Sequence, residues 1–590
     1  MTIKTTKTVT PYALRATLVV TAGIAFAPLS LAVSPPPLES SQGMVVTTER
    51  VASDVGAAVL RQGGNAIDAA VAIGYALAVT HPTAGNIGGG GFMMIHLANG
   101  KDTFINFREK APHAASATMY QDAKGNVIPD KSLNGYLAVG IPGTVLGLET
   151  ARKKYGTMSL ETLITPAIGL AETGFMMVRG DVDDFDADST AMLLKQPNIA
   201  AIFLPGGKVM QPGNRLVQRN LAATLKLIRD GGPDAFYKGP IADAVVAASQ
   251  AHGGILTKAD FAGYTVSETA PITCQYRGYT LVSAPPPSSG GIVMCQMFKV
   301  LEAYPLGEYG FHSSAELHVM TEAMRNAYFD RNTFLGDPAF VNNPIERLLS
   351  SAHIEEIRAR IKPNQATPSL TLGQAAAPPE NRNTTHYSVL DKSGNAVAVT
   401  YTLNNSFGAK VMAGDTGFIL NDEMDDFSAK PGAPNLDGLI YGTANAIAPG
   451  KQPLSSMSPS VVLKDGKVLL VVGTPGGSRI ITTVFETIVN VLDHGMTLQE
   501  AIDAPRVHHQ WLPDTLAAES FALSADTAAA LTQMGYKIVP LENWGSSNAV
   551  EAIGVAPADL PLAKKLGFPR PGLMYGAADS RAPAGSPAAP

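Results

Sequence analysis

The chain has 590 residues, which is enough for one large globular body or for several domains. Charged residues make up 16% of it, below the roughly 25% of an average soluble domain. The net charge is −6 and no run of basic residues occurs, so the composition disfavours a nucleic-acid-binding protein.

The first 32 residues have the composition of a cleaved signal peptide. Lys4, Lys7 and Arg15 precede an apolar run, and a Ser-Leu-Ala sequence ends at Ala32. A membrane anchor is the alternative, but the run is short and contains Pro28. We expect residues 1–32 to be removed, which would change the net charge from −6 to −9 because three basic residues and no acidic ones are lost. The mature protein is predicted to be periplasmic or secreted, without a stable membrane anchor.

The next segment predicts two helices and a strand pair. Small and apolar residues recur at helical spacing over 48–60 and 66–79, and alternating segments at 92–97 and 103–107 flank an Asn-Gly turn. The four glycines at 88–91 lack the spacing of a dinucleotide-binding motif and are not followed by a Lys-Ser/Thr pair. They therefore favour close packing of backbone in a core.

The chain contains two cysteines, Cys274 and Cys295. The first lies in a strand-like segment at 272–282, and the second lies in a helical pattern at 292–303. One disulfide and two buried thiols remain equally acceptable, because the spacing does not give the separation of the Cα atoms.

A change of pattern follows a long, mainly helical region that includes an amphipathic helix at 314–328. Residues 361–382 are rich in Pro, Gln, Ala and Asn, which is typical of an exposed linker. After Asn383 the sequence alternates over 385–390 and 395–402 around a turn that contains Gly394. A hairpin with this loop would place Thr384 opposite positions 401–403.

Thr384, at the head of this strand, is a candidate nucleophile. On its own the segment Thr384–Leu390 is most simply a strand rich in β-branched residues. If the Asn383–Thr384 bond is cut, however, the new α-amino group has a pKa of about 8 and can accept the hydroxyl proton during attack. The predicted hairpin brings Thr402 and Asn404 beside this amine, where they could orient it. His386 is then not needed as a base, and we expect it to be packed or hydrogen-bonded.

The remaining elements complete an α/β pattern. A second hairpin is predicted from 460–463 and 468–472, and a helix from 480–492. Strand pairs flanked by helices indicate a layered α/β sandwich. Residues 577–590 are rich in Ala and Pro and are predicted to be a disordered tail.

Four motifs give the chain a resemblance to the γ-glutamyltransferases (γ-glutamyltranspeptidases) of the N-terminal-nucleophile hydrolase superfamily, from about Gly43 to about Gly554. These motifs are Thr384-Thr385-His386-Tyr387-Ser388, Asp425-Asp426-Phe427-Ser428, Pro453-Leu454-Ser455-Ser456-Met457-Ser458-Pro459 and Pro475-Gly476-Gly477-Ser478-Arg479. The resemblance implies a four-layer αββα sandwich and a precursor that cuts itself before Thr384. The products would be a large subunit, 33–383, and a small catalytic subunit, 384–590, which remain together as a heterodimer without cofactor or metal.

The resemblance also implies a role for each matched residue. Thr384 would form an acyl-enzyme from glutathione or another γ-glutamyl compound, and water or an amino acid or peptide amine would resolve it. Arg108, Ser455 and Ser456 would bind the substrate α-carboxylate, while Glu423 and Asp426 would accept its α-ammonium group. Gly476 and Gly477 would form the oxyanion hole, because glycine N–H groups can approach an oxyanion closely.

Other functions are disfavoured by particular features. A glutaryl or cephalosporin acylase, or a poly-γ-glutamate enzyme of the same fold, is the main alternative, but Arg108, Asp426 and the serine pair favour a free amino-acid head group. A catalytically silent binding protein would remain uncut. There is no Gly-x-Ser-x-Gly elbow for a serine hydrolase, and the His508-His509 pair lacks companion metal ligands.

One position departs from the resemblance. Family members with a lid over the site often carry an aromatic residue where this chain has Asp437, within the loop 431–439. The loop is of full length, so a lid is still expected. Without the aromatic cap we expect looser shielding of the acyl-enzyme from water and a larger share of hydrolysis.

Replacing this residue tests the prediction. Asp437→Tyr should raise the ratio of transfer to hydrolysis, because an aromatic cap would exclude water from the acyl-enzyme. The ratio is measured with γ-glutamyl-p-nitroanilide in the presence and absence of a dipeptide acceptor. An unchanged ratio would contradict the assignment of this position to shielding.

Overall fold

The structure is a computed structural model that describes residues 1–2, 34–373, 384–433, 435, 439–541 and 549–590. Residues 3–32 of the predicted signal peptide, Asn383 and Asp437 lie outside the described residues. Residues 1–35 form a unit of their own, of which four residues are described; the account below concerns Pro36–Pro590. No helix among the described residues is both long enough and apolar enough to cross a membrane.

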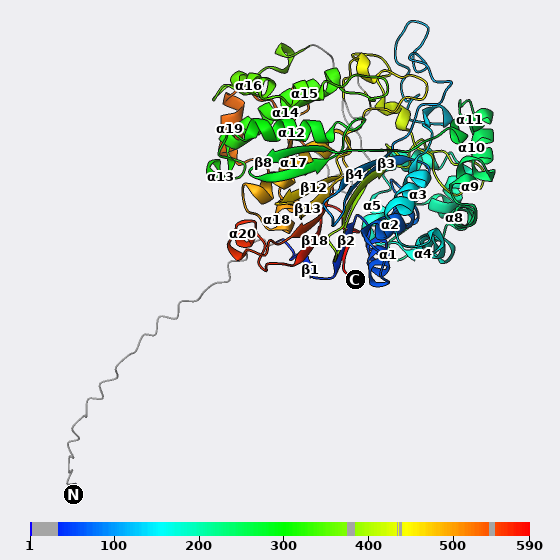
Figure 1. Cartoon of the computed structure of the whole chain (residues 1–590), viewed down its shortest axis with the longest axis horizontal. Coiled ribbons are helices and arrows are strands. Elements are labelled where there is room, and N and C mark those ends of the chain that lie inside the picture. The colour runs from blue at the N-terminus through cyan, green and yellow to red at the C-terminus, as the bar shows by residue number, and fades with distance from the viewer. Residues whose placement is uncertain (3–33, 374–383, 434, 436–438, 542–548) are drawn as a thin grey trace. The chain divides into compact units, whose positions relative to one another are not determined.

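Two seven-stranded antiparallel sheets lie face to face at the centre of this unit (Figure 1). The first sheet has the strand order β1 (Leu38–Ser40), β18 (Met574–Ala578), β17 (Glu551–Val555), β13 (Lys467–Gly473), β12 (Ser460–Lys464), β9 (Tyr279–Ser283) and β8 (Ile272–Tyr276). The second has the order β19 (Ser586–Ala588), β2 (Gly43–Thr47), β10 (Thr385–Asp391), β11 (Ala396–Thr402), β3 (Gly90–His96), β4 (Asp102–Phe107) and β7 (Ser267–Thr269).

Helices cover the outer face of each sheet. Those against the first sheet include α12 (Gly290–Leu301), α17 (Ile480–Leu492) and α18 (Leu498–Asp503), with α14 (Ser314–Phe334) and α16 (Ser351–Arg360) packed on α12. Those against the second sheet include α2 (Ala66–Thr80) and α3 (Thr144–Tyr155), with α1 (Arg50–Arg61), α4 (Leu160–Thr173) and α8 (Arg219–Gly231) around them. The predicted four-layer αββα sandwich is therefore confirmed.

The apolar patterns account for these positions. Every residue of α2 is buried, and it is apolar on nearly all sides, as expected of a helix enclosed in a core. Its first turn is fixed by a capping box between Asn65 and Asp68. The predicted helices at 48–60, 66–79 and 480–492 and all the predicted hairpins are confirmed within one or two residues at most ends.

The glycine run at 88–91 packs as the sequence predicted. An added Cβ on Gly89 would lie 2.0 Å from the carbonyl oxygen of Thr402, and one on Gly91 would lie 2.5 Å from that of Thr400. Both contacts are with backbone, which cannot move aside as a flexible side chain can. The glycines thus let the chain pass close to the end of β11, where Asn86 Nδ2 also donates a 2.9 Å hydrogen bond to the Thr402 carbonyl.

The predicted disordered tail is wrong. Residues 577–590 contain the end of β18 and all of β19, which pairs with β2 through Ser586, Pro587 and Ala588. β19 is an edge strand, where a proline that lacks the N–H donor is tolerated, so an Ala/Pro-rich composition does not prevent pairing. Ion pairs of Asp579 with Arg506 and of Arg581 with Glu519 fix the segment to the body.

The predicted linker is also partly ordered. Ser369 is fully buried, its N–H donates to Asp514 Oδ2 at 2.8 Å, and its carbonyl accepts from Trp511 Nε1 at 2.9 Å. Residues 374–383 lie outside the described part of the chain. The linker is therefore anchored to the C-terminal half of the protein before it reaches Thr384.

Cys274 on β8 and Cys295 on α12 form a disulfide, which decides between the two alternatives left open by the sequence. The bond closes a loop with a sequence separation of 21 residues and ties the edge of the first sheet to its covering helix. A loop of this length removes enough conformational entropy from the unfolded chain to stabilise the fold by about 3 kcal/mol.

Replacing both cysteines by serine should therefore lower the free energy of unfolding by about 2–4 kcal/mol, because the unfolded chain regains this freedom. The measurement is the melting temperature of wild type and double variant, each with and without dithiothreitol. Reductant should lower that of the wild type and leave the double variant unchanged. Equal melting temperatures for the variant and the oxidised wild type would contradict the expected contribution.

Candidate active site

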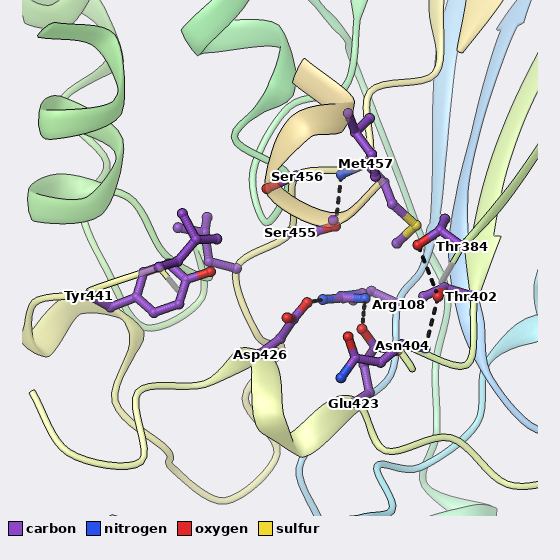
Figure 2. Close-up of a pocket in the computed structure, with 14 residues that line it drawn as sticks. Arg108, Thr384, Thr402, Asn404, Glu423, Asp426, Tyr441, Ser455, Ser456 and Met457 are labelled. Carbon is purple, nitrogen blue, oxygen red and sulfur yellow. Dashed lines mark hydrogen bonds and ion pairs between the residues drawn. The ribbon is translucent and has the colours of Figure 1, made fainter. Parts of the chain in front are cut away.

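A pocket with about 370 Å³ of empty space opens at the end of the second sheet (Figure 2). It is lined by residues from both sides of position 384. Nine of the residues that the sequence singled out lie on its wall: Arg108, Thr384, Thr402, Asn404, Glu423, Asp426, Ser455, Ser456 and Gly477. Leu439, Leu454, Tyr441, Met457 and Ile480 complete the wall.

The register of the β10–β11 hairpin brings Thr384 to the pocket. Thr385 pairs with Tyr401, which sets Thr384 beside Thr402, within the range predicted from the loop length. The two hydroxyl oxygens are 3.2 Å apart, and Thr402 Oγ1 also accepts a 2.8 Å hydrogen bond from the N–H of Asn404. Asn404 has φ of 78°, a left-handed conformation that asparagine adopts more readily than most residues.

His386 lies two residues along the same strand and takes no part in the pocket. It is fully buried, and burial lowers the pKa of its imidazole to about 3, so the ring is neutral. Its Nδ1 lies 2.8 Å from the hydroxyl of Thr400, and its Nε2 lies 3.1 Å from that of Ser388. The expectation of a packed, hydrogen-bonded histidine is confirmed.

Arg108 follows the last residue of β4 and points into the pocket. Its guanidinium donates to the carboxylates of Glu423 and Asp426, both in the 3-10 turn η4 (Glu423–Asp426), as Figure 2 shows. A third carboxylate, that of Glu109, lies 3.7 Å from Arg108 Nη1. One positive charge is thus surrounded by three acidic side chains.

The ionisation of this cluster follows from burial and proximity. Burial opposes the charge of Arg108, but the carboxylates of Glu423, Asp426 and Glu109 outweigh it and raise the pKa of the guanidinium. Burial raises the pKa of Glu109 to about 7 and that of Glu423 well above its usual range, against the opposing effect of Arg108. The site therefore holds acidic groups that bind protons more readily than ordinary carboxylates.

The serine pair faces this cluster from a turn fixed by backbone hydrogen bonds. Ser455 N–H donates to the carbonyl of Pro287 at 2.8 Å, and the N–H and hydroxyl of Ser289 donate to the carbonyl of Ser455 at 2.9 and 2.7 Å. The start of α12 thereby holds the turn in place. Ser455 Oγ accepts a 3.1 Å hydrogen bond from Met457 N–H, also drawn in Figure 2.

The two predicted oxyanion-hole glycines end the wall near α17. Gly476 has φ of 134° and Gly477 has φ of 54°, conformations that favour glycine over residues with a Cβ. Gly477 lines the pocket, whereas Gly476 precedes it as the cap of the 3-10 turn η6 (Gly477–Arg479).

Several wall residues were not found from the sequence. Tyr441 and Ile480 lie outside the four motifs, and Leu439 and Met457, although they belong to the predicted lid loop and the serine motif, were given no role. Arg331, which donates to Ser456 Oγ at 2.8 Å from behind the wall, lies on a helix that the sequence indicated only as scaffold. Nothing in the local sequence distinguishes a buried arginine from an exposed one.

The other sequence candidates lie elsewhere. His508 Nδ1 is 2.8 Å from Thr482 Oγ1, and His509 Nε2 is 3.3 Å from Asp514 Oδ1. Burial lowers the pKa of both imidazoles, to about 3 and about 4 respectively. Among the described residues, no group of three or more His, Cys, Asp or Glu side chains is arranged to hold a metal ion.

Two stacked antiparallel sheets between helical layers, with a threonine at the head of a central strand and a pocket around its hydroxyl, define a hydrolase of the N-terminal-nucleophile class. A family model described as Gamma-glutamyltranspeptidase matches residues 52–588. The chain belongs to this γ-glutamyltranspeptidase family.

Known proteins agree with this assignment. The chain is 55% identical to a glutathione hydrolase proenzyme of Pseudomonas sp. (strain A14), over 93% of this chain and 94% of the relative. It is 48% identical to a glutathione hydrolase proenzyme of Escherichia coli (strain K12), over 92% and 91% of the two chains. Among solved structures, a cephalosporin acylase from Bacillus halodurans matches with a TM-score of 0.80 at 25% identity, covering 96% of this chain and 99% of its own.

The charge balance of the pocket leads to a pH-dependent prediction. Arg108→Gln should destabilise the fold by about 3–5 kcal/mol at pH 8, because the buried carboxylates lose the cation that pairs with them among the described residues. At pH 5 the loss should be smaller. The carboxyl groups of Glu109 and Glu423, whose pKa values are already raised by burial, then bind protons and become neutral.

Melting temperatures of wild type and variant at the two pH values measure this difference. Arg179→Gln is the matched control, since Arg179 forms an exposed pair with Asp183 and should have little effect at either pH. A deficit of equal size at pH 5 and pH 8 would contradict the proposed balance of charge.

Proposed function

We propose that the chain is the precursor of a self-cleaving γ-glutamyltransferase and glutathione hydrolase in which Thr384 is the nucleophile. The observation that carries the proposal is the position of Thr384 in the pocket, with its hydroxyl 3.2 Å from that of Thr402 and an arginine–carboxylate cluster on the same wall. Cleavage of the Asn383–Thr384 bond would convert the amide nitrogen of Thr384 into a free amine. The same residue would then carry nucleophile and base.

The reaction would proceed through an acyl-enzyme. The Thr384 hydroxyl attacks the γ-carbonyl carbon of glutathione or another γ-glutamyl compound, while the α-amine accepts its proton. The C–N bond to the leaving amine breaks and that amine takes up the proton. Water then attacks the ester in hydrolysis, or the amine of an amino acid or peptide attacks it in transfer. Backbone N–H groups at Gly476 and Gly477 would stabilise the oxyanion in both steps.

The head group of the substrate would exchange partners with the pocket. In the unliganded cluster Arg108 donates to Glu423 and Asp426. A γ-glutamyl substrate carries an α-carboxylate and an α-ammonium group. Each charged side chain of the cluster could therefore exchange its present partner for the substrate group of opposite charge. Arg108 and the serine pair would bind the carboxylate, and Glu423 and Asp426, with Asn404 beside them, would bind the ammonium group.

A heterodimer of the two fragments is supported by the sheet order. Strands β10 and β11, after the cleavage site, lie between β2 and β3, before it, in the second sheet. In the first sheet β12 pairs with β9 across the same division. Each fragment therefore lacks central strands that the other supplies, and we expect the fragments to co-elute under native conditions and to separate in denaturant.

We also propose export to the periplasm or the medium after removal of residues 1–32. The composition of this segment supports the proposal, and so does the disulfide, which is typical of oxidising compartments. N-terminal sequencing of the mature protein tests it: a first residue near Val33 is expected, and an N-terminus at Met1 would contradict processing.

A glutaryl or cephalosporin acylase is the second candidate, favoured by the structural likeness to the Bacillus halodurans cephalosporin acylase. A glutaryl group carries a carboxylate and no ammonium group, and would leave Glu423 and Asp426 without a cationic partner from the substrate. The acidic residues thus favour the γ-glutamyl substrate. Rates with γ-glutamyl-p-nitroanilide and glutaryl-p-nitroanilide distinguish the two candidates.

The central prediction concerns Thr384. Thr384→Ala should remain a single chain and have no activity, because no hydroxyl is left to attack the preceding carbonyl or the substrate. Intact-mass measurement should give one species, whereas the wild type should give two that begin near residue 33 and at residue 384.

Thr384→Ser is the matched control, since it keeps the hydroxyl and should still cut itself. A Thr384→Ala protein that cleaves before residue 384, or that retains activity, would overturn the proposal. An uncut wild-type chain would instead favour a catalytically silent binding protein.

A further inference from the structure

Arg331, in the last turns of α14, is buried directly behind the serine pair. Only 1% of its surface is exposed. Its Nε donates to Ser289 Oγ and one of its terminal nitrogens donates to Ser456 Oγ, both at 2.8 Å. The guanidinium carbon lies 5.3 Å from the centre of the Tyr441 ring, which lines the pocket. One side chain thus joins the start of α12, the serine turn and the segment that carries Tyr441.

The positive charge of Arg331 has no acidic partner among the residues that the structure describes. Its contacts there are with neutral groups: the hydroxyls of Ser289, Ser456 and Tyr441 and the side-chain amide oxygen of Asn332. Buried charges in proteins are usually paired, since an unpaired charge is costly in a medium of low polarity. Arg108 and Arg325, which are equally buried, both follow this rule.

The hydrogen bonds of the two serines are arranged for an anion. A hydroxyl has two acceptor lone pairs and one proton to donate. Arg331 donates to Ser456 Oγ, and the N–H of Met457 donates to Ser455 Oγ. Within the described part of the chain, neither hydroxyl donates a hydrogen bond. Both protons therefore remain free for an acceptor in the pocket.

We propose that Arg331 is a positioning residue for substrates that carry an α-carboxylate. It acts through Ser456: it donates to the hydroxyl oxygen and thereby leaves the hydroxyl proton for the carboxylate. It also adds a second positive charge behind the serine turn. The inference rests on the proposed γ-glutamyl function and extends it, because it assigns part of the carboxylate specificity to a residue outside the pocket wall.

The test compares two substrates that differ only in the α-carboxylate. Both γ-glutamyl-p-nitroanilide and 4-aminobutyryl-p-nitroanilide carry the amino group and the same leaving group. In Arg331→Met the ratio of their kcat/KM values should fall by about ten- to a hundredfold, the loss typical of a hydrogen bond to a charged group. Glutaryl-p-nitroanilide, which keeps the carboxylate and lacks the amine, should lose reactivity in parallel with the γ-glutamyl substrate.

Three further variants separate positioning from a merely structural role. Arg331→Lys keeps the charge and should retain most of the selectivity. Arg331→Gln keeps N–H donors without the charge and should lose the selectivity. If Arg331→Met does not fold, the selectivity ratio of Arg331→Gln tests the role of Arg331. Arg325→Met is the matched control. Arg325 lies on the same helix and is equally buried, but its partners are Ser369, Asp514 and Glu322. It should lower the melting temperature and leave the selectivity ratio unchanged.

The possible results separate the two proposals. A wild-type enzyme without activity on γ-glutamyl-p-nitroanilide would overturn the proposed function. An active wild type whose selectivity ratio stays within threefold in Arg331→Met or Arg331→Gln would overturn only the role of Arg331. An equal loss of selectivity in Arg325→Met would show that the effect is a general consequence of destabilising α14.

Discussion

The pairing of β10 with β11 in the middle of the second sheet fixes the geometry on which the rest of the site depends. Both strands are buried along their whole length, so a shift by one residue would exchange the side chains on the two faces of the sheet. This constraint holds Thr384 beside Thr402. The glycines at 89–91 allow the neighbouring backbone to reach the end of β11, which anchors Thr402 from its other side.

The division of the chain at Thr384 does not coincide with a division of the core. Both sheets contain strands from before and after this residue, and Ser369, just before the predicted cut, is held by Asp514 and Trp511 from the second half. A cut there leaves the strand pairing between the two fragments in place. Self-cleavage can therefore free a terminus in the pocket while the scaffold around it stays folded.

The charges of the pocket are arranged in two layers. Arg108 lies on the wall among three carboxylates, and Arg331 lies behind the serine turn among neutral groups. In the first arrangement the arginine is paired with carboxylates before substrate binds, and a zwitterionic head group can take over these contacts. The second leaves a positive charge that has no acidic partner among the described residues and that a bound anion would complement. The positive charges would thus serve the carboxylate of an amino-acid head group, and the acidic side chains would serve its ammonium group.

The sequence by itself determined the elements that depend on local pattern. Alternation predicted the β10–β11 hairpin and the loop length predicted its register, while helical periodicity predicted α2 and α17. The motif residues Arg108, Asp426 and Ser455 were found because their types and order resemble a known family. Only the tertiary structure decided the disulfide, the pairing of β19 with β2, the anchoring of Ser369 and the contact of Arg331 with Ser456. Each of these depends on the distance between residues far apart in the chain, and no local periodicity records such a distance.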